Sequence, residues 1–273
     1  ALNNNFIKQK IELVPQMFDN NKVMANTTEA LLLASKHKKQ LLAWYKKMSN
    51  LNIEEILIAQ HGELLVINKP PKWPTTGRSL SDDDCVQYHL MEYFGTMVWA
   101  VHQLDADTSG LCLFTLSKSL TTDLKNLWSD QSMVKEYFAI THGEPEWDTT
   151  DEYSPIGSVG EGSLGVHQDG KSAHTNFKVI DRSDVYSLIR ARLHTGRTHQ
   201  IRIHLAHLGH PLVGEEWYRN PPCLLHPRQA LHAHRLEFPV NEVLPSNSFT
   251  APVTADLNDL VERLGLRMDL TPA

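Results

Sequence analysis

Residues 194–204 read His-Thr-Gly-Arg-Thr-His-Gln-Ile-Arg-Ile-His, a basic segment in which a predicted strand gives way to a predicted helix. The segment places two arginines and three histidines around a glycine turn at the start of that helix. The free N–H groups of a helix start and the guanidinium group both favour phosphate or carboxylate, the guanidinium through paired hydrogen bonds. We therefore expect an anionic ligand or an acidic side chain to dock at this segment.

The helix is predicted to start at Thr198 and to end at Gly209, which is followed by Pro211. It carries an apolar face at helical spacing, made by Ile201, Leu205 and Leu208. Arg202 lies one turn into the helix, beside this face but not on it. We expect Arg202 to be partly exposed to solvent and to reach back into a pocket, where it can hold an acidic partner.

Most of the chain outside this segment has the pattern of β-strands. The even-numbered residues from Val134 to Ile140 fall on one face, and Lys135 and Tyr137 fall on the other. Asp169-Gly170 predicts a two-residue hairpin turn between the residues on either side of it. A first hairpin is predicted around His61-Gly62-Glu63. The predicted strands cover residues 56–58, 64–67, 111–116, 134–142, 173–180 and 186–193.

Helical patterns interrupt these strands in few places. Ser117 can cap a helix that continues to Trp128. Because the strands do not alternate regularly with helices, the pattern predicts an α+β fold with a mixed, mostly antiparallel β-sheet and flanking helices. Residues 1–50 are predicted to form a helical N-terminal extension, and residues 51–273 a single domain.

Composition limits the possible classes of protein. With 273 residues, 41% of them hydrophobic, the chain can bury a large core. No apolar stretch is long enough to span a bilayer, and the three cysteines lie far apart without paired spacing, so we expect a cytoplasmic protein with neither a disulfide framework nor a cysteine zinc site. A net charge of −6 excludes a uniformly basic surface. Any nucleic-acid site must therefore be a local basic patch.

Two carboxylates precede the apolar strand at residues 111–116. Asp105 and Asp107 lie in the run Val101 to Gly110, and either can serve as a nucleophile or general base, although aspartate and serine are also ordinary turn residues. A second possibility is a metal site among His199, His204, His207 and His210. No carboxylate or cysteine lies at a ligand spacing from these histidines, so surface or capping roles fit them better.

The order and spacing of several motifs resemble the RluA family of pseudouridine synthases over about 200 residues. These motifs comprise residues 56–70, His102-Gln103-Leu104-Asp105 with Thr108-Ser109-Gly110, Lys135-Glu136-Tyr137, Gly170 to Ala173, residues 194–214, and residues 231–239. The resemblance implies the pseudouridine synthase fold and an RNA substrate, with rRNA or tRNA stem-loops as the expected partners. It also implies isomerisation of uridine to pseudouridine without a metal, nucleotide or organic cofactor.

The resemblance also assigns roles to particular residues. Asp105 would act at the ribose of a flipped-out uridine, as a nucleophile or by removing a sugar proton. Arg202 would hold Asp105 ionised and oriented, and Tyr137 would pack against the uracil. Ile201 would form an apolar wall of the pocket. Lys69, Lys171 and Arg197 are the expected phosphate contacts.

One residue departs from the family pattern. Gln103 stands where most members have an arginine that is associated with the flipped RNA conformation, so the choice of substrate cannot be carried over. Two alternatives stay open at this point: a noncatalytic RNA-binding protein on the same fold, and a histidine-metal hydrolase. We expect the protein to be a monomer.

Overall fold

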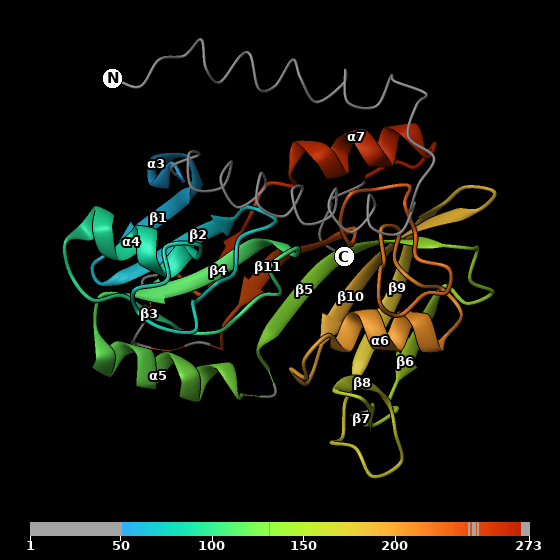
Figure 1. Cartoon of the computed structure of the whole chain (residues 1–273), viewed down its shortest axis with the longest axis horizontal. Helices are drawn as coiled ribbons and strands as arrows, with labels where there is room; N and C mark the ends of the chain where they lie inside the picture. The colour runs from blue at the N-terminus through green and yellow to red at the C-terminus, as the bar shows by residue number, and fades with distance from the viewer. Residues whose placement is uncertain (1–50, 131, 240, 242–243, 245, 269–273) are drawn as a thin grey trace, which may run out of the picture. The chain divides into compact units, whose positions relative to one another are not determined.

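The computed structural model describes residues 51–130, 132–239, 241, 244 and 246–268 (Figure 1). The helical extension expected at residues 1–50 lies outside the described residues, and the domain boundary near residue 50 stays a prediction. Ten strands form one large sheet: β1 (Leu57–His61), β2 (Leu64–Lys69), β3 (Trp99–Ala100), β4 (Ser109–Thr115), β5 (Val134–His142), β6 (Thr149–Glu152), β9 (Thr175–Arg182), β10 (Tyr186–Leu193), β11 (Leu231–Glu237) and β12 (Ser248–Thr250). A separate two-stranded hairpin consists of β7 (Ile156–Gly160) and β8 (Ser163–Val166).

The main path of the sheet runs β1-β2-β4-β11-β5-β10-β9-β6, with β3 paired to β4 and β12 paired to β11. Its pairs are antiparallel except for β4 and β11, which run parallel where Gly110 lies opposite Ala233. Gly110 has φ 109°, and a Cβ there would lie 2.2 Å from the Ala233 carbonyl oxygen. Only glycine therefore allows this close approach. The predicted α+β class with a mostly antiparallel sheet is confirmed.

Helices cover both faces of the sheet where the candidate site lies (Figure 1). Leu257 and Leu260 of one helix share a core cluster with Phe138, while Ile201 of another shares a different cluster with Tyr137. Because successive strand residues point to opposite faces, these two clusters lie on the two faces of β5, in agreement with the predicted alternation. The helices are α3 (Ile53–Ile56), α4 (Val86–Phe94), α5 (Lys118–Trp128), α6 (Gln200–His207) and α7 (Ala255–Arg263). In the part of the chain that the structure describes, no helix has both the length and the apolar composition needed to cross a membrane.

Two predicted helix starts had different outcomes. Ser117 caps α5 as predicted, since its side chain accepts a hydrogen bond from the Leu120 N–H. The second helix, α6, starts at Gln200 rather than at Thr198, because His199 takes a left-handed conformation with φ 56° at its N-cap. Residues 200–205 are all buried, so the first turns of α6 have no exposed face.

The hairpin predicted at Asp169-Gly170 is wrong in its pairing. A turn does form, with the Gly170 N–H donating to the His167 carbonyl at 2.8 Å. The residue after the turn, Lys171, pairs instead with Ile156 through two backbone hydrogen bonds of 2.8 and 3.0 Å. A Cβ on Gly170 would lie 2.5 Å from the Ile156 carbonyl carbon, so this glycine serves a close backbone approach.

Candidate active site

The loop that carries Asp105 connects β3 to β4 and is fixed on both sides of the aspartate. Before it, the Thr75 hydroxyl donates to the Leu104 carbonyl and accepts from the Leu104 N–H, both at 3.0 Å. After it, the Ala106 carbonyl accepts from Lys69 Nζ at 2.9 Å. Leu104 is buried in the core. The backbone around Asp105 is therefore held by groups that come from the start of the domain.

Lys69 has a different place from the one expected of a phosphate contact. It is fully buried, and its ammonium donates to the carbonyls of Pro70, Trp73 and Ala106 at 2.9, 2.8 and 2.9 Å. Burial lowers the pKa of Lys69 to about 7, while the three carbonyl acceptors match the three hydrogens of its ammonium form. Lys69 thus positions the loop, and the expected contact with RNA phosphate is not supported.

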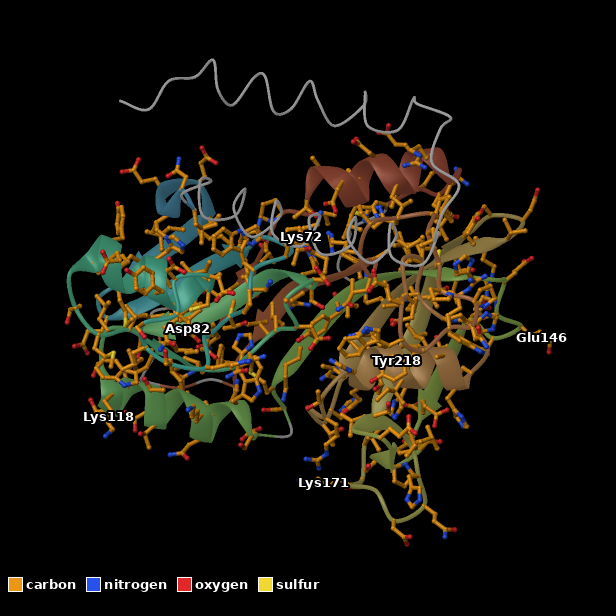
Figure 2. All side chains as sticks on the ribbon, viewed as in Figure 1. Lys72, Asp82, Lys118, Glu146, Lys171 and Tyr218 are labelled. Carbon is orange, nitrogen blue, oxygen red and sulfur yellow. The ribbon has the colours of Figure 1, made fainter. Side chains whose placement is uncertain are left out.

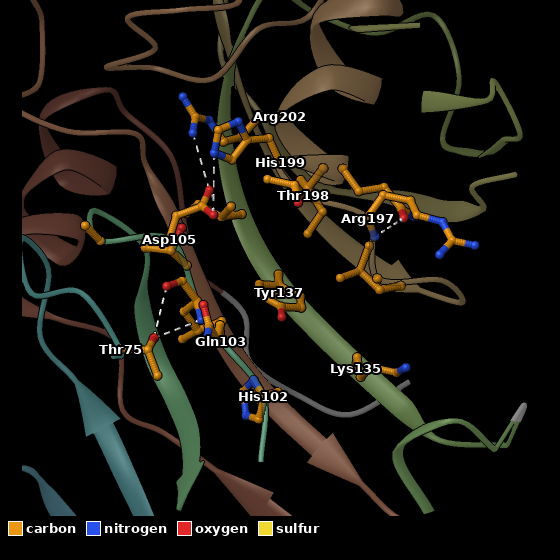
Figure 3. A pocket seen from close by; sticks show the side chains of 18 of the residues that line it. Thr75, His102, Gln103, Asp105, Lys135, Tyr137, Arg197, Thr198, His199 and Arg202 are labelled. Carbon is orange, nitrogen blue, oxygen red and sulfur yellow. Dashed lines mark hydrogen bonds and ion pairs between the residues drawn. The ribbon is translucent and has the colours of Figure 1, made fainter. Parts of the chain in front are cut away.

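The Asp105 carboxylate meets three side chains from distant parts of the chain, and Figure 3 shows two of them, Arg202 and His199. Its Oδ2 atom accepts from Arg202 Nη1 and from Gln229 Nε2, each at 3.3 Å. Its Oδ1 atom lies 3.7 Å from His199 Nε2. The side chain remains 27% exposed. One carboxylate oxygen is thus anchored by two donors while the group still faces the adjoining cavity.

Arg202 is buried, which corrects the expectation that it would face solvent. Its guanidinium forms a two-point pair with Glu215, at 3.0 Å from Nε to Oε2 and 2.7 Å from Nη2 to Oε1. The rings of Trp217 and Tyr218 each lie 5.1 Å from the guanidinium carbon. Burial opposes the charge of Arg202, but hydrogen bonds to Glu215 and the charge of that residue outweigh this effect and raise the pKa of Arg202. Arg202 therefore bridges Glu215 and Asp105 as a permanent cation.

Glu215 holds more than the arginine. It is fully buried, and its Oε1 atom also accepts from the backbone N–H groups of Trp217 and Tyr218 at 3.0 and 3.3 Å. Burial alone would raise the pKa of Glu215, but the hydrogen bonds and charge of Arg202 lower it. The carboxylate is thus an ionised anchor for both Arg202 and the loop that covers it.

His199 completes this group from its position before α6. Its Nδ1 atom lies 2.7 Å from the Tyr218 hydroxyl. Burial lowers the pKa of His199 below its ordinary value, and the effect of burial exceeds that of the nearby Asp105 charge, which acts in the opposite direction. A neutral imidazole that accepts from Tyr218 through Nδ1 can direct its Nε2–H toward Asp105.

The carboxylate faces a cavity of about 500 Å³. Tyr137 of β5 and Ile201 of α6 line this cavity, and both are largely buried. Figure 3 shows Tyr137 on β5 between Asp105 and Lys135. Burial, and then the charge of Asp105, raise the pKa of the Tyr137 phenol, which keeps its hydroxyl protonated near neutral pH. A ring and a carboxylate therefore share one cavity.

The cavity extends past Gln103 toward Lys135. Gln103 is exposed, and its amide donates to the Thr76 hydroxyl at 3.1 Å. His102 stacks on Trp128 with 4.1 Å between ring centroids, and Lys135 Nζ lies 5.1 Å from the centroid of the same tryptophan. Gln103 thus presents a neutral amide at the cavity wall.

Arg197 and Lys171 lie near a second hollow of about 420 Å³ that the hairpin β7–β8 helps to form. Arg197 Nε donates to the Ser172 carbonyl at 2.9 Å, and Lys171 is exposed (Figure 2). The segment Gly196-Arg197-Thr198 lines this hollow and the Asp105 cavity alike. The two hollows therefore share one wall, and both cations lie beside it.

The four histidines considered as metal ligands have other environments. His199 pairs as described, His204 lies 2.9 Å from the Thr175 hydroxyl and 3.0 Å from the Ser154 carbonyl, and His210 lies 3.1 Å from the His142 carbonyl. His207 is exposed. Within the described residues, no three histidine, cysteine, aspartate or glutamate side chains converge as metal ligands would.

Several residues around Asp105 were not predicted to belong to the site. Glu215 follows the apolar run Leu212-Val213-Gly214, and an acidic residue directly after such a run was the available sign that it is buried. Gln229 and Thr75 carry no comparable signal, because amides and hydroxyls are common in loops. By contrast, Asp105 and Arg202, which are 97 positions apart, do meet.

Comparisons with known proteins were made on sequence and on structure. Residues 63–207 match the family model described as RNA pseudouridylate synthase. The chain is 31% identical over 235 residues to Ribosomal large subunit pseudouridine synthase D of Haemophilus ducreyi, covering 78% of this chain and 71% of that relative. It is 35% identical over 166 residues to the uncharacterized RNA pseudouridine synthase YlyB of Bacillus subtilis, covering 60% of this chain and 55% of that relative. Human RNA Pseudouridylate Synthase Domain Containing 4 has a similar fold, with a TM-score of 0.67 and 21% identity over 83% of this chain and 99% of that one.

Proposed function

Since this chain belongs to the RluA family of RNA pseudouridine synthases, we propose that Asp105 is the carboxylate through which it isomerises uridine in RNA to pseudouridine. The reaction breaks the bond between N1 of uracil and C1′ of ribose, turns the base, and joins C5 to C1′. C5 then loses a proton and N1 gains one. Nothing leaves the complex, so the enzyme must hold a detached base beside the ribose.

This proposal rests on the difference in hydrogen bonding between the two carboxylate oxygens of Asp105. Arg202 and Gln229 both donate to Oδ2, whereas among the described residues Oδ1 has only His199 beside it, at 3.7 Å. We therefore assign Oδ1 as the atom that acts on ribose, either by attack on C1′ or by removal of a sugar proton. An anchored carboxylate needs little reorganisation to reach the reacting atom, which lowers the barrier.

Arg202 acts on the reaction through Asp105. Its guanidinium donates to Oδ2 and is itself held by Glu215 in a buried two-point pair. The donor to Oδ2 is therefore fixed in place before the RNA binds, which holds the carboxylate in one orientation. We assign Arg202 as a positioning residue.

Tyr137 provides the surface for the base. Its ring lines the same cavity as Asp105, and an aromatic face stacks well on a flat uracil. Because burial keeps the phenol protonated, its hydroxyl serves as a proton carrier rather than as a phenolate base. Ile201 closes the cavity with an apolar side chain that keeps water from the detached base.

The target uridine must leave its stack to enter the cavity, which costs a few kcal/mol and is easiest in a loop. Arg197 and Lys171 stand beside the neighbouring hollow, where they fit as contacts to the phosphates on either side of the uridine. Gln103 replaces a cation at the wall with an amide, so these two residues carry more of the phosphate contact. We propose ribosomal or transfer RNA as the substrate, and the relative named as a ribosomal large subunit enzyme favours rRNA.

Mapping pseudouridine in cellular RNA tests this proposal. Total RNA is compared from cells that have the gene, cells that lack it, and cells that carry only Asp105→Asn. Sites lost in the deletion and also absent with Asp105→Asn name the substrate and support Asp105 as the catalytic residue. If Asp105→Asn restores the lost sites, Asp105 has another role.

A further inference from the structure

Three aromatic rings stack at the ends of three neighbouring strands, beside the Asp105 cavity. The centroids of Tyr153 and His174 lie 4.2 Å apart with their planes 17° from parallel. His174 and His194 lie 4.0 Å apart with their planes 8° from parallel. At one end of this aromatic stack, the Tyr153 side chain is 62% exposed, and at the other end His194 is exposed. A stack of this kind offers a flat face to solvent.

The sheet register produces the stack. Leu193 of β10 pairs with Thr175 of β9, and Thr175 pairs with Glu152 of β6. His194, His174 and Tyr153 are the next residue beyond each of these three, on adjacent strands (Figure 1). Neighbouring strands lie about 4.8 Å apart, which is close to the separation of stacked rings. The rings therefore stack where the strands end.

Hydrogen bonds fix the middle ring and tie it to α6. His174 Nε2 lies 2.7 Å from Asp151 Oδ1. The His174 carbonyl accepts from the His194 N–H at 3.1 Å and from Gln200 Nε2 at 3.0 Å. Gln200 begins the helix that carries Arg202. The stack is thus preorganised with respect to the segment that forms the cavity wall.

The aromatic stack starts where the cavity ends. Leu193 and Lys135 line the cavity, and His194 is the residue after Leu193. Partial burial and the nearby charges of His174, Arg192 and Lys135 lower the pKa of His194, while the Asp151 carboxylate acts in the opposite direction. An RNA strand that leaves the cavity here meets an exposed ring on which a base can stack, and Arg197 of the cavity wall is a half-buried cation that can contact a phosphate.

We propose that Tyr153, His174 and His194 form a stacking platform for an unpaired nucleobase of the RNA that neighbours the target uridine. This proposal rests on the proposed function, because it requires RNA in the cavity. Aromatic rings, histidine included, stack on unpaired bases with little sequence preference. The platform would hold the splayed strand after the uridine has left its stack, and would not read the base that it holds.

The test combines protein variants with RNAs that lack one base. The probe is a short single-stranded RNA of adenosines around one uridine, with an abasic ribose placed in turn at each position that flanks the uridine. Affinity is measured by fluorescence anisotropy for the wild type, Tyr153→Ala, Tyr153→Phe and His194→Ala. Tyr93→Ala is the matched control, since Tyr93 is also a half-exposed tyrosine but lies on α4.

Loss of a stacked base or of its ring weakens binding by about 5- to 100-fold. We expect this loss for Tyr153→Ala on the intact RNA, and for the wild type on the RNA that is abasic at one flanking position. His194→Ala should lose less, because the His194 ring supports His174 from the side opposite Tyr153. On that abasic RNA, Tyr153→Ala should bind like the wild type. Tyr153→Phe and Tyr93→Ala should keep wild-type affinity, and the melting temperature of Tyr153→Ala should be unchanged.

Two outcomes overturn the platform. One is that Tyr153→Ala binds every RNA as tightly as the wild type does. The other is that its loss of affinity is equal on intact and abasic RNA. Failure of the proposed function is detected separately, by release of tritium from RNA labelled at C5 of uridine. If the wild-type enzyme releases tritium and Tyr153→Ala binds RNA normally, the platform is contradicted and the proposed function is not.

Discussion

The buried pair between Arg202 and Glu215 makes the effect of Arg202→Ala calculable. The arginine side chain is 5% exposed and the glutamate side chain 0%, and two hydrogen bonds of 3.0 and 2.7 Å join them. Removing one partner of such a pair leaves an uncompensated buried charge and costs about 3–5 kcal/mol. For a domain of this size each kcal/mol lowers the melting temperature by about 2–4 °C, so Arg202→Ala should melt about 6–20 °C lower.

Activity and stability should separate in a double variant. Arg202→Met with Glu215→Leu removes both charges, and apolar replacement of a buried pair is often neutral for stability. The double variant should therefore unfold at higher urea concentration than Arg202→Ala, as followed by circular dichroism. Its rate of tritium release from uridine-labelled RNA should stay at least about 100-fold below that of the wild type, because Asp105 has lost its anchor. A melting temperature for Arg202→Ala equal to that of the wild type, or a double variant with normal activity, would refute this reasoning.

Three further perturbations address other parts of the site. Tyr137→Phe keeps the ring and removes the hydroxyl, so its turnover should fall by roughly 10²- to 10⁴-fold if the hydroxyl carries a proton, with little change in RNA affinity; normal turnover would show that the ring alone suffices. Burial lowers the pKa of His232 from 6.5 to about 3. Between these two pH values the imidazole is protonated in the unfolded chain and neutral in the folded chain. Urea titrations should therefore show that the free energy of unfolding falls with decreasing pH about 1.4 kcal/mol per unit more steeply for the wild type than for His232→Gln, and equal slopes would contradict this. Gln103→Arg adds a cation at an exposed wall, so the dependence of single-stranded RNA affinity on salt should steepen by about 0.7 in log–log slope without a change in melting temperature, and an unchanged slope would place residue 103 away from phosphate.

The sequence pattern predicted strand bounds and helix caps, which depend on residues close together in the chain. Tyr186–Leu193 was predicted as a strand with the bounds that β10 has, and Ser117 was predicted to cap α5. The Asp169-Gly170 turn misled because a turn motif does not specify which strand its flanking residues join. Lys171 pairs with Ile156, a partner fifteen positions earlier, and only the folded chain decides this.

The candidate site, too, was predicted in part. The resemblance brought Asp105, Tyr137 and Arg202 together, and these residues do lie around one cavity. The burial of Arg202 could not be read from its helical position, because Glu215 and the rings after it cover the helix from a loop that has no periodic pattern. Lys69 was misplaced for a similar reason: a lysine before two prolines looks exposed until its three carbonyl partners are known.

The central claim concerns Asp105, and Asp107 provides the matched control in the same loop. Both are partly exposed, but only Asp105 lines the cavity and pairs with Arg202. The direct measurement is tritium release from RNA labelled at C5 of uridine by Asp105→Asn and Asp107→Asn, each at a matched fraction of folded protein. We expect Asp105→Asn to release essentially no tritium and Asp107→Asn to release it at close to the wild-type rate. Release by Asp105→Asn at the wild-type rate would contradict the account.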